Sequence, residues 1–216
     1  MPPPPVPAGT RTLVVLVEGL LGFGWEWDAP LVELRKAPGV FVEIFHWSPV
    51  SGLARIARDL ALRLDEQLAK LPPSVTRVLL FGHSAGGMVT AFAAKDIRTN
   101  VDVHIVNIGA PYAGMQTIPF EAKDFVWAPI FFTMGCTFTR YPLPAARVSI
   151  ESWVTTWPGD PVMQPRFGHD PGDPHVGPPG PRHVLPPGGD HNRVLDEVMK
   201  ETLTSMGLRP SVDEPR

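Results

Sequence analysis

The sequence has a single cysteine, no excess of basic residues and no long apolar run. The lone Cys136 excludes an internal disulfide framework and a metal site built on a cysteine pair. A segment that crosses a bilayer needs roughly 20 apolar residues, and no run approaches that length, so we predict no integral membrane segment. The 19 Lys and Arg residues stand against 22 Asp and Glu residues, and this balance disfavours nucleic acid as a partner. No targeting segment is recognisable, which favours a soluble chain in the cytoplasm.

Apolar segments of strand and helix character alternate along the chain. Continuous β-branched and leucine runs such as 12–17 are typical of strands buried on both faces. Leucines at steps of three and four predict a helix that opens at Ser48 or Ser51 and ends at Pro72. The alternation predicts an α/β fold, with a mainly parallel sheet and helices on both faces. The predicted strands cover residues 12–17, 40–47, 75–81, 101–108, 150–157 and 182–185, and the other helices cover 85–98 and 192–206.

Proline and glycine are abundant, with 27 and 20 residues, and they are unevenly distributed. A run of prolines predicts a disordered tail over residues 1–10. Residues 11–210 are predicted to form a single domain, because a chain of this length can share one core. The aromatic-rich segment 114–147 is predicted to be an insertion above the sheet, serving as a cap or lid. The Pro- and Gly-rich segment 158–190 is too long for an ordinary connection and is predicted to be a functional or mobile loop.

The strongest chemical signal is the pentapeptide Gly82-His83-Ser84-Ala85-Gly86. It stands between a predicted strand and a predicted helix of small residues, which is the context of a sharp turn that carries a nucleophilic serine. Such a turn strains the serine backbone and leaves no room for bulk two residues to either side. We therefore predict Ser84 as a nucleophile, with the Ala85 amide facing the negative charge that develops during the reaction. The alternative is a glycine-rich turn with a helix-capping serine.

A serine hydroxyl needs a base to take its proton, and the chain has seven histidines. His191 follows the last predicted strand and precedes the last predicted helix, on a loop that can reach over the serine. It is the predicted base, and the alternative for it is a surface or helix-start histidine. His83 lies within the pentapeptide and is predicted to point away from the hydroxyl. The remaining histidines fall in predicted strands or in the loop 158–190.

The base in turn needs an acid that holds its tautomer and stabilises its charge. Asp160 follows the fifth predicted strand through a Pro-Gly turn and is the predicted acid. The order Ser84, Asp160, His191 along the chain is the one expected of nucleophile, acid and base on this kind of sheet. Asp124 in the insertion is the second candidate for the acid, and Asp173 is the third.

A backbone turn after the first predicted strand supplies the remaining part of a site. Gly19 lets the chain turn so that the Leu20 amide joins that of Ala85 as a second donor to an oxyanion. No cofactor or metal is predicted. The stretch 169–175 contains His and Asp residues, but neither their order nor their spacing fits a recognised metal site, and a solvated loop is the favoured interpretation.

Together these segments resemble the α/β-hydrolase superfamily and, within it, the bacterial lipases and esterases. The resemblance covers the chain from about Arg11 onward. It implies an α/β-hydrolase fold with about six parallel strands and without the family's first hairpin. Glu18 and Tyr112 each stand where the family commonly has histidine, so the hydrogen bonding behind Gly19 must differ. The segments that carry the resemblance are Glu18-Gly19-Leu20, 82–87, 107–114, Gly159-Asp160-Pro161-Val162 and Gly189-Asp190-His191.

The resemblance implies cleavage of a carboxylic ester, with a small-molecule or lipidic acyl ester bound between the sheet edge and the insertion 114–147. A thioesterase or acyltransferase with the same acyl-enzyme is the alternative. A non-catalytic binding protein on this fold is disfavoured, because binding needs neither a strained serine nor a matched base. Trp25 and Trp27 are candidates for the mouth of the pocket. The aromatic residues of the insertion are interpreted first as its own small core and second as an acyl pocket.

Overall fold

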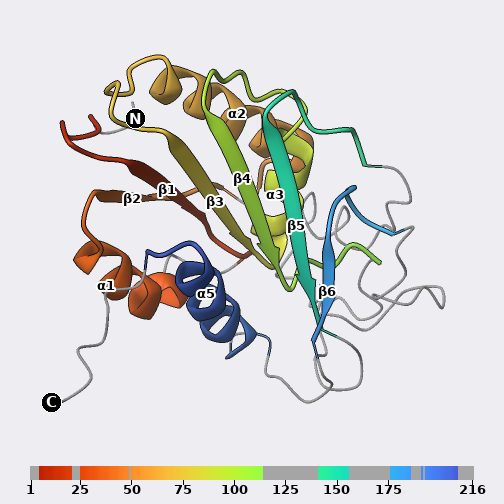
Figure 1. Cartoon of the computed structure of the whole chain (residues 1–216). Coiled ribbons are helices and arrows are strands. Elements are labelled where there is room, and N and C mark those ends of the chain that lie inside the picture. The colour runs from red at the N-terminus through yellow and green to blue at the C-terminus, as the bar shows by residue number, and fades with distance from the viewer. Residues whose placement is uncertain are drawn as a thin grey trace, which may run out of the picture.

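The computed structural model describes residues 5–20, 25–48, 50–113, 141–155, 176–185, 191 and 193–208. In these residues six strands form one sheet in the order β2-β1-β3-β4-β5-β6, and every neighbouring pair is parallel (Figure 1). The predicted α/β fold with a parallel sheet of about six strands is confirmed. The strands are β1 (Thr12–Val17), β2 (Val40–Phe45), β3 (Arg77–His83), β4 (Asp102–Ile108), β5 (Val148–Val154) and β6 (Arg182–Val184).

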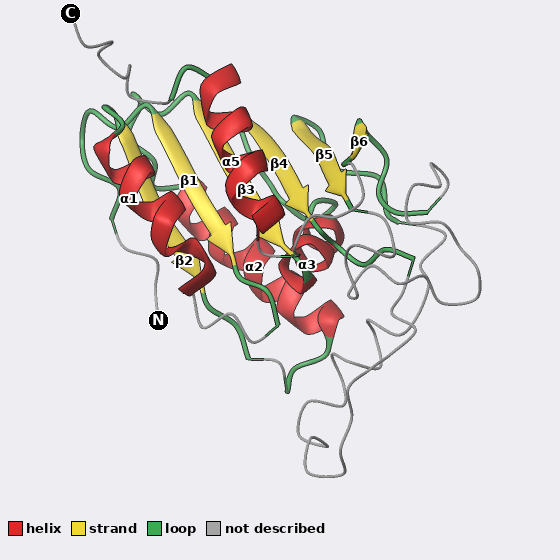
Figure 2. Ribbon diagram, turned by 90° about the horizontal axis from the view of Figure 1, so that it is seen from below, coloured by secondary structure: helices red, strands yellow, loops and turns green. Residues whose placement is uncertain are grey.

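Helices cover both faces of the sheet, as predicted. Helices α1 (Asp28–Lys36) and α5 (Arg193–Ser205) lie on one face, and α2 (Leu53–Leu68) and α3 (Ala85–Ala93) lie on the other (Figure 2). A short 3-10 turn, η1 (Trp25–Trp27), directly precedes α1. None of the described helices is both long enough and apolar enough to cross a membrane.

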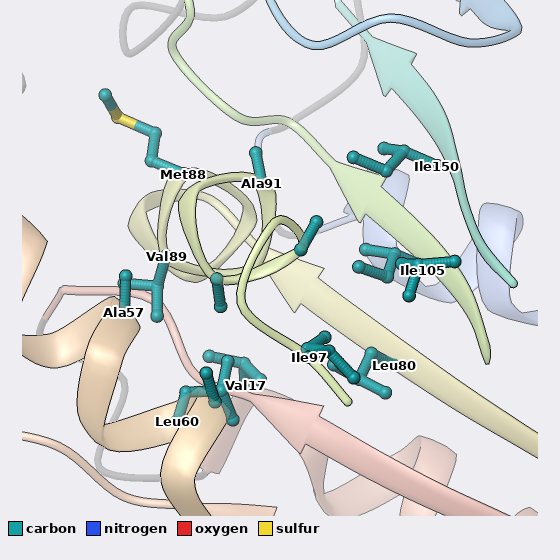
Figure 3. Close-up of a cluster of buried hydrophobic side chains, with 14 of the residues drawn as sticks. Val17, Ala57, Leu60, Leu80, Met88, Val89, Ala91, Ile97, Ile105 and Ile150 are labelled. Carbon is teal, nitrogen blue, oxygen red and sulfur yellow. The ribbon is translucent and has the colours of Figure 1, made fainter. Parts of the chain in front are cut away.

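The central strand β1 is buried along its whole length, which explains its unbroken apolar sequence. Neighbouring side chains of a strand point to opposite faces of the sheet. Leu13, Val15 and Val17 join the core under α2 and α3, while Val14 and Leu16 join the core under α1 and α5. Figure 3 shows the first core, where Val17 lies among side chains of α2 and α3. Full burial of such a side chain contributes about 1.5–3 kcal/mol, so the two cores hold the sheet between its helix layers.

Helix α2 confirms the helix predicted from the leucine spacing, but it begins later. Gly52 occupies the N-cap position, so the helix starts after both predicted serines. Its apolar residues recur at steps of three and four and therefore share one face, which is buried. They are Leu53, Ile56, Leu60, Leu64 and Leu68.

Helix α1 is not among the predicted elements. It is nine residues long and buries only Pro30, Leu31 and Leu34, so its apolar periodicity is weak. Its end signals are nevertheless present. Asp28 lies in the first turn and basic residues lie in the last, where each charge interacts favourably with the helix dipole. Short helices of this kind are marked by their ends more than by their period.

The strand order indicates at which edge of the sheet a ligand would bind. From β1 the chain passes to β2 on one side and then returns to β3 on the other side of β1. In parallel sheets, ligands bind beyond the carboxyl ends of the strands at such a point of reversal. Glu18 follows β1 and Ser84 follows β3, so the predicted oxyanion loop and the predicted nucleophile leave the sheet side by side.

Candidate active site

Ser84 occupies the sharp turn between β3 and α3, as the pentapeptide predicts. Its φ of 51° and ψ of −121° lie in a region that non-glycine residues rarely adopt. Holding a serine there costs about 1–3 kcal/mol, so the surrounding structure must fix it. The Ser84 N–H donates to the Ile108 carbonyl over 2.8 Å, and the Gly87 N–H donates to the Ser84 carbonyl over 3.0 Å. These bonds anchor the turn to the end of β4 and to the start of α3.

Gly82 and Gly86 leave no room for side chains, as expected two residues to either side of the serine. A Cβ atom on Gly86 would lie 2.6 Å from the Glu18 carbonyl oxygen and would collide with the Val17 carbonyl as well. A Cβ atom on Gly82 would lie 2.8 Å from the Gly86 carbonyl oxygen. Helix α3 therefore packs directly on the end of β1, and this contact brings the helix start beside the predicted oxyanion loop.

Gly19 brings that loop against the nucleophile. A Cβ atom on Gly19 would lie 3.3 Å from the Ser84 Cβ atom. Leu20, the predicted donor, follows Gly19 directly and is half-buried. Ala85 is the first residue of α3, where the N–H groups have no acceptor within the helix. The predicted donor Ala85 therefore follows Ser84 directly, and the predicted donor Leu20 follows Gly19, which lies beside Ser84.

His191, the predicted base, lies over the carboxyl end of β4. A Cβ atom on Gly109, whose φ is 60°, would lie 3.1 Å from Cε1 of the His191 ring. The Gly109 N–H donates to the Trp153 carbonyl over 2.8 Å, which joins this position to β5. Ser84 is hydrogen-bonded to Ile108, and His191 lies against the next residue, Gly109. The predicted nucleophile and the predicted base therefore both lie at the carboxyl end of β4.

The predicted acid, Asp160, lies outside the described residues, as do its rivals Asp124 and Asp173. Strand β5 runs parallel to β4 and ends at Val154, so the chain leaves it at the edge of the sheet where Ser84 lies. An acid on the loop after β5 suits this geometry, and the choice of Asp160 stays a prediction.

Most of the insertion 114–147 and the whole stretch 169–175 also lie outside the described residues. At the described end of the insertion Tyr141 is buried, and its ring packs on those of Phe92 and Tyr112 at centroid distances of 4.9 and 5.3 Å. Tyr112 stands where the resembled family has histidine, and burial raises its pKa to about 12. It is therefore a neutral phenol that packs this segment onto α3.

Glu18 stands where the family has its other histidine, and its carboxylate turns towards the end of β2. Glu18 Oε2 lies 3.1 Å from Nδ1 of His46, and the Trp47 N–H donates to Oε1 over 3.4 Å. The Trp47 indole N–H donates to the Glu18 carbonyl over 3.0 Å. Burial raises the pKa of Glu18, and His46 and the Trp47 N–H only partly oppose it. Glu18 ties β1 to β2 and leaves the support of Gly19 to another residue.

Glu26, which is not among the predicted site residues, supports the Gly19 amide. Its Oε1 accepts the Gly19 N–H over 2.6 Å and lies 3.7 Å from Nδ1 of His83. Burial alone would raise the pKa of Glu26, but His83 and the Gly19 N–H together hold it below its usual range. Trp27, predicted at a pocket mouth, is instead fully buried against the His83 ring, while Trp25 is 57% exposed. No local pattern marks Glu26, because its partner lies seven residues earlier in the chain.

No protein-family model and no curated protein matches the sequence significantly. Solved structures do share its architecture. The chain is similar to the mature form of the lipase BlEst2 from Bacillus licheniformis, with a TM-score of 0.59 and 15% identity over 97% of this chain and 96% of the lipase. The chain has the α/β-hydrolase fold.

Other proteins with the α/β-hydrolase fold are similar to the same degree. The RedJ thioesterase of the prodiginine pathway in Streptomyces coelicolor has a TM-score of 0.57 and 15% identity, over 94% of this chain and 88% of the thioesterase. A bromoperoxidase from Bacillus anthracis has a TM-score of 0.55 and 16% identity, over 92% of this chain and 93% of its own. Identity this low shows the fold alone, and the fold carries differently named activities.

A hollow of about 580 Å³ lies at the opposite edge of this α/β-hydrolase fold. It is lined by residues just before β3 and β4, among them Val75 and Val101, and by the end of α2. Of the predicted site residues that the structure describes, Leu20, Ser84, Ala85 and His191, none borders it. These four residues lie at the carboxyl ends of the strands and not at this hollow.

Proposed function

We propose that the chain is a serine hydrolase that cleaves a carboxylic ester through an acyl-enzyme on Ser84. The observation that carries the proposal is a serine held at positive φ beside the strand end over which His191 lies. A binding site does not require a serine in that conformation, whereas a nucleophile on a strand-to-helix turn does, because the sharp turn lifts its hydroxyl clear of the sheet. The fold-level similarity to a lipase and a thioesterase supports a hydrolase over a non-catalytic binding protein.

In the proposed reaction, His191 takes the proton of the Ser84 hydroxyl as the serine oxygen attacks the acyl carbon. The N–H groups of Leu20 and Ala85 donate to the oxyanion of the tetrahedral intermediate. The intermediate collapses as His191 returns the proton to the leaving alcohol oxygen, and the acyl group stays on Ser84. Water then attacks the acyl-enzyme with His191 again as base, and the carboxylic acid leaves. Asp160 accepts a hydrogen bond from the His191 ring and stabilises its positive charge.

A thioesterase is the second candidate function. The same acyl-enzyme forms from a thioester, with a sulfur leaving group in place of oxygen. The observation in its favour is the similarity to the RedJ thioesterase over 94% of this chain. An acyltransferase differs from both only in the group that accepts the acyl chain.

A fluorophosphonate probe tests the nucleophile, and a matched pair of substrates tests the leaving group. We expect the probe to label Ser84 in the unsubstituted protein and to leave Ser84→Ala unlabelled. We expect p-nitrophenyl butyrate to be hydrolysed with a kcat that falls by at least about 10⁴-fold in Ser84→Ala. Equal labelling of the variant, or unchanged ester turnover, contradicts the proposal. Turnover of the butyryl thioester without turnover of the ester selects the thioesterase.

Two further variants decide the acid. Asp160→Asn is expected to lower kcat about 10⁴-fold, because the imidazole loses the partner that fixes its tautomer. Asp124→Asn is the matched control and is expected to change kcat by less than about threefold. The reverse ranking in the same ester assay assigns the role to Asp124.

A further inference from the structure

Beneath the proposed site, Glu26 and His83 form a buried pair that the proposed reaction does not use. Their side chains are 2% and 4% exposed, and Glu26 Oε1 lies 3.7 Å from Nδ1 of His83. Glu26 comes from the turn η1, and His83 is the last residue of β3. Burial of ionisable groups at this depth is costly, and an apolar pair of similar volume would pack as well. The pair therefore calls for an explanation beyond packing.

Glu26 fixes the oxyanion loop. Its Oε1 accepts the Gly19 N–H in a buried hydrogen bond of 2.6 Å. This bond holds the peptide group that precedes Gly19, so only the two backbone torsions of Gly19 stand between the anchored peptide and the Leu20 N–H. The bond also commits the Gly19 N–H, which leaves the Leu20 N–H as the group that can turn towards Ser84.

His83 fixes the base. Its Nε2 donates to the His191 carbonyl over 3.3 Å, and the two imidazole rings lie 5.0 Å apart at 40°. Because a carbonyl oxygen only accepts, Nε2 carries a hydrogen. Nδ1 lies 3.7 Å from Glu26 Oε1, beyond hydrogen-bond distance, and can donate towards the carboxylate only when it carries a hydrogen as well. Trp27 packs edge-on against the His83 ring, with centroids 6.3 Å apart. The bond to His191 and the packing of Trp27 thus orient the His83 ring, with Nδ1 on the side of Glu26.

We propose that Glu26 and His83 act as one positioning unit that holds the Leu20 amide and the His191 ring in register around Ser84. The unit rests on the proposed function, because it serves the same site. Both members act through another residue, Glu26 through Gly19 and His83 through the backbone and ring of His191. One buried pair thereby links the two parts of the site that come from opposite ends of the chain.

The charges around Glu26 suit this role. The lowered pKa of Glu26 keeps it a carboxylate at neutral pH, and a carboxylate accepts a stronger hydrogen bond from an N–H than a neutral acid does. Glu18 is the other carboxylate that faces it, and Glu18 is turned towards His46 on the far side of β1. Glu26 therefore serves Gly19 and His83 without competition.

Such a unit acts on the rate of reaction more than on substrate binding. Hydrogen bonds to an oxyanion strengthen only in the transition state, and a base must be aligned when the proton moves. Glu26→Ala is therefore expected to lower kcat about 100-fold while KM changes by less than about twofold. Glu26→Gln retains an oxygen that can accept the Gly19 N–H, and its kcat is expected to fall only about tenfold.

Glu43 on β2 offers a matched control. As whole residues Glu26 and Glu43 are both 8% exposed, and Glu43 pairs with Arg63 away from Ser84. The assay measures kcat and KM for p-nitrophenyl butyrate, the rate of fluorophosphonate labelling and the melting temperature of each variant. Glu43→Ala and Glu43→Gln are expected to shift the melting temperature as the Glu26 variants do and to keep kcat within about twofold.

A double-mutant cycle tests whether the two residues act together. His83→Ala and Glu26→Ala are expected to be non-additive, so that the double variant loses little more kcat than the worse single variant. Additive losses overturn the shared unit. A Glu26→Gln or Glu26→Ala variant with kcat no lower than its Glu43 counterpart overturns the positioning role. Absence of labelling in the unsubstituted protein overturns the proposed function, and this inference with it.

Discussion

The middle of the sheet and the carboxyl ends of β1, β3 and β4 are built in different ways. In the middle, Leu80 and Ile105 are fully buried among apolar side chains of α3 and the neighbouring strands (Figure 3). At the carboxyl ends stand glycines with no room for a Cβ atom, a serine at positive φ and two buried carboxylates. The first region stabilises the fold and the second stores strain. Stability and the proposed activity therefore reside in different parts of one sheet, and single substitutions should separate them.

Gly86→Ala is expected to have the largest effect on stability. The added methyl group meets the backbone oxygens of Val17 and Glu18, so α3 must move off the end of β1. We expect the free energy of unfolding in urea to fall by about 4 kcal/mol, and probe labelling of Ser84 to be lost. Gly52→Ala is the control, because a Cβ atom there meets nothing within 4 Å, and its cost should stay below about 1 kcal/mol. Similar losses in both variants would remove the contrast between the regions.

Ile105→Ala probes the middle of the sheet. Its side chain is fully buried in β4, and the cavity left behind is expected to cost about 3 kcal/mol in urea unfolding. Ester turnover at a temperature where the variant remains folded should stay within about twofold of the unsubstituted rate. Leu62→Ala, at a residue 56% exposed on α2, is the control and should cost less than about 0.5 kcal/mol. A large drop in kcat for Ile105→Ala would show that the two regions are coupled.

Ser84→Gly is expected to stabilise the protein while it abolishes turnover. Relief of the strained φ contributes about 1–3 kcal/mol, and the greater freedom of glycine in the unfolded chain offsets about 0.5–1 kcal/mol of that. A net gain of about 1 kcal/mol in the free energy of unfolding follows. Ser84→Ala is the control, since it loses the hydroxyl but keeps a Cβ atom at φ 51°. If the two variants are equally stable, the turn stores no strain.

The smallest expected effect is a difference in the pH dependence of stability between Glu26 and Glu43. Burial raises the pKa of Glu43 above 4.5, although Arg63 opposes it, so its favourable contribution is fully present below pH 4.5 and is lost as the pH rises through the folded-state value. The lowered pKa of Glu26 has the opposite sign, so its contribution is present above pH 4.5 and is lost as the pH falls.

Urea unfolding between pH 7 and pH 3 measures these contributions. As the pH is lowered, the unsubstituted protein should gain stability relative to Glu43→Gln and lose it relative to Glu26→Gln. If both differences in the free energy of unfolding changed in the same direction as the pH is lowered, the surroundings of the two carboxylates would not differ as described.

Much of the fold and of the proposed nucleophile could be predicted because the constraints on them are local. Strand β1 is an unbroken apolar run, and its observed bounds are those predicted. The positive φ of Ser84 follows from a strand before it, a helix after it and glycine two residues to either side. Helix α1 escaped prediction because only three of its nine residues are buried.

The support of the site could not be predicted, because its contacts join distant parts of the chain. His83 bonds to a backbone group 108 residues away, and no motif or periodicity connects the two. Glu26 shows no signal in its own segment, and its role appears only when η1 folds back on Gly19. The burial of Trp27 could not be predicted either, because the sequence does not distinguish an aromatic residue beside a pocket from one in a core.

The hydrogen bond between Gly19 and Glu26 also bears on protein engineering. It joins Gly19, just after β1, to Glu26 in the turn η1, seven residues later in the chain. A library that varies substrate preference should therefore keep both residues fixed, so that the proposed donor Leu20 keeps its anchored neighbour. A substitution at either residue would disturb the end of the loop and the buried carboxylate together, so changes meant to alter specificity are better directed to other positions.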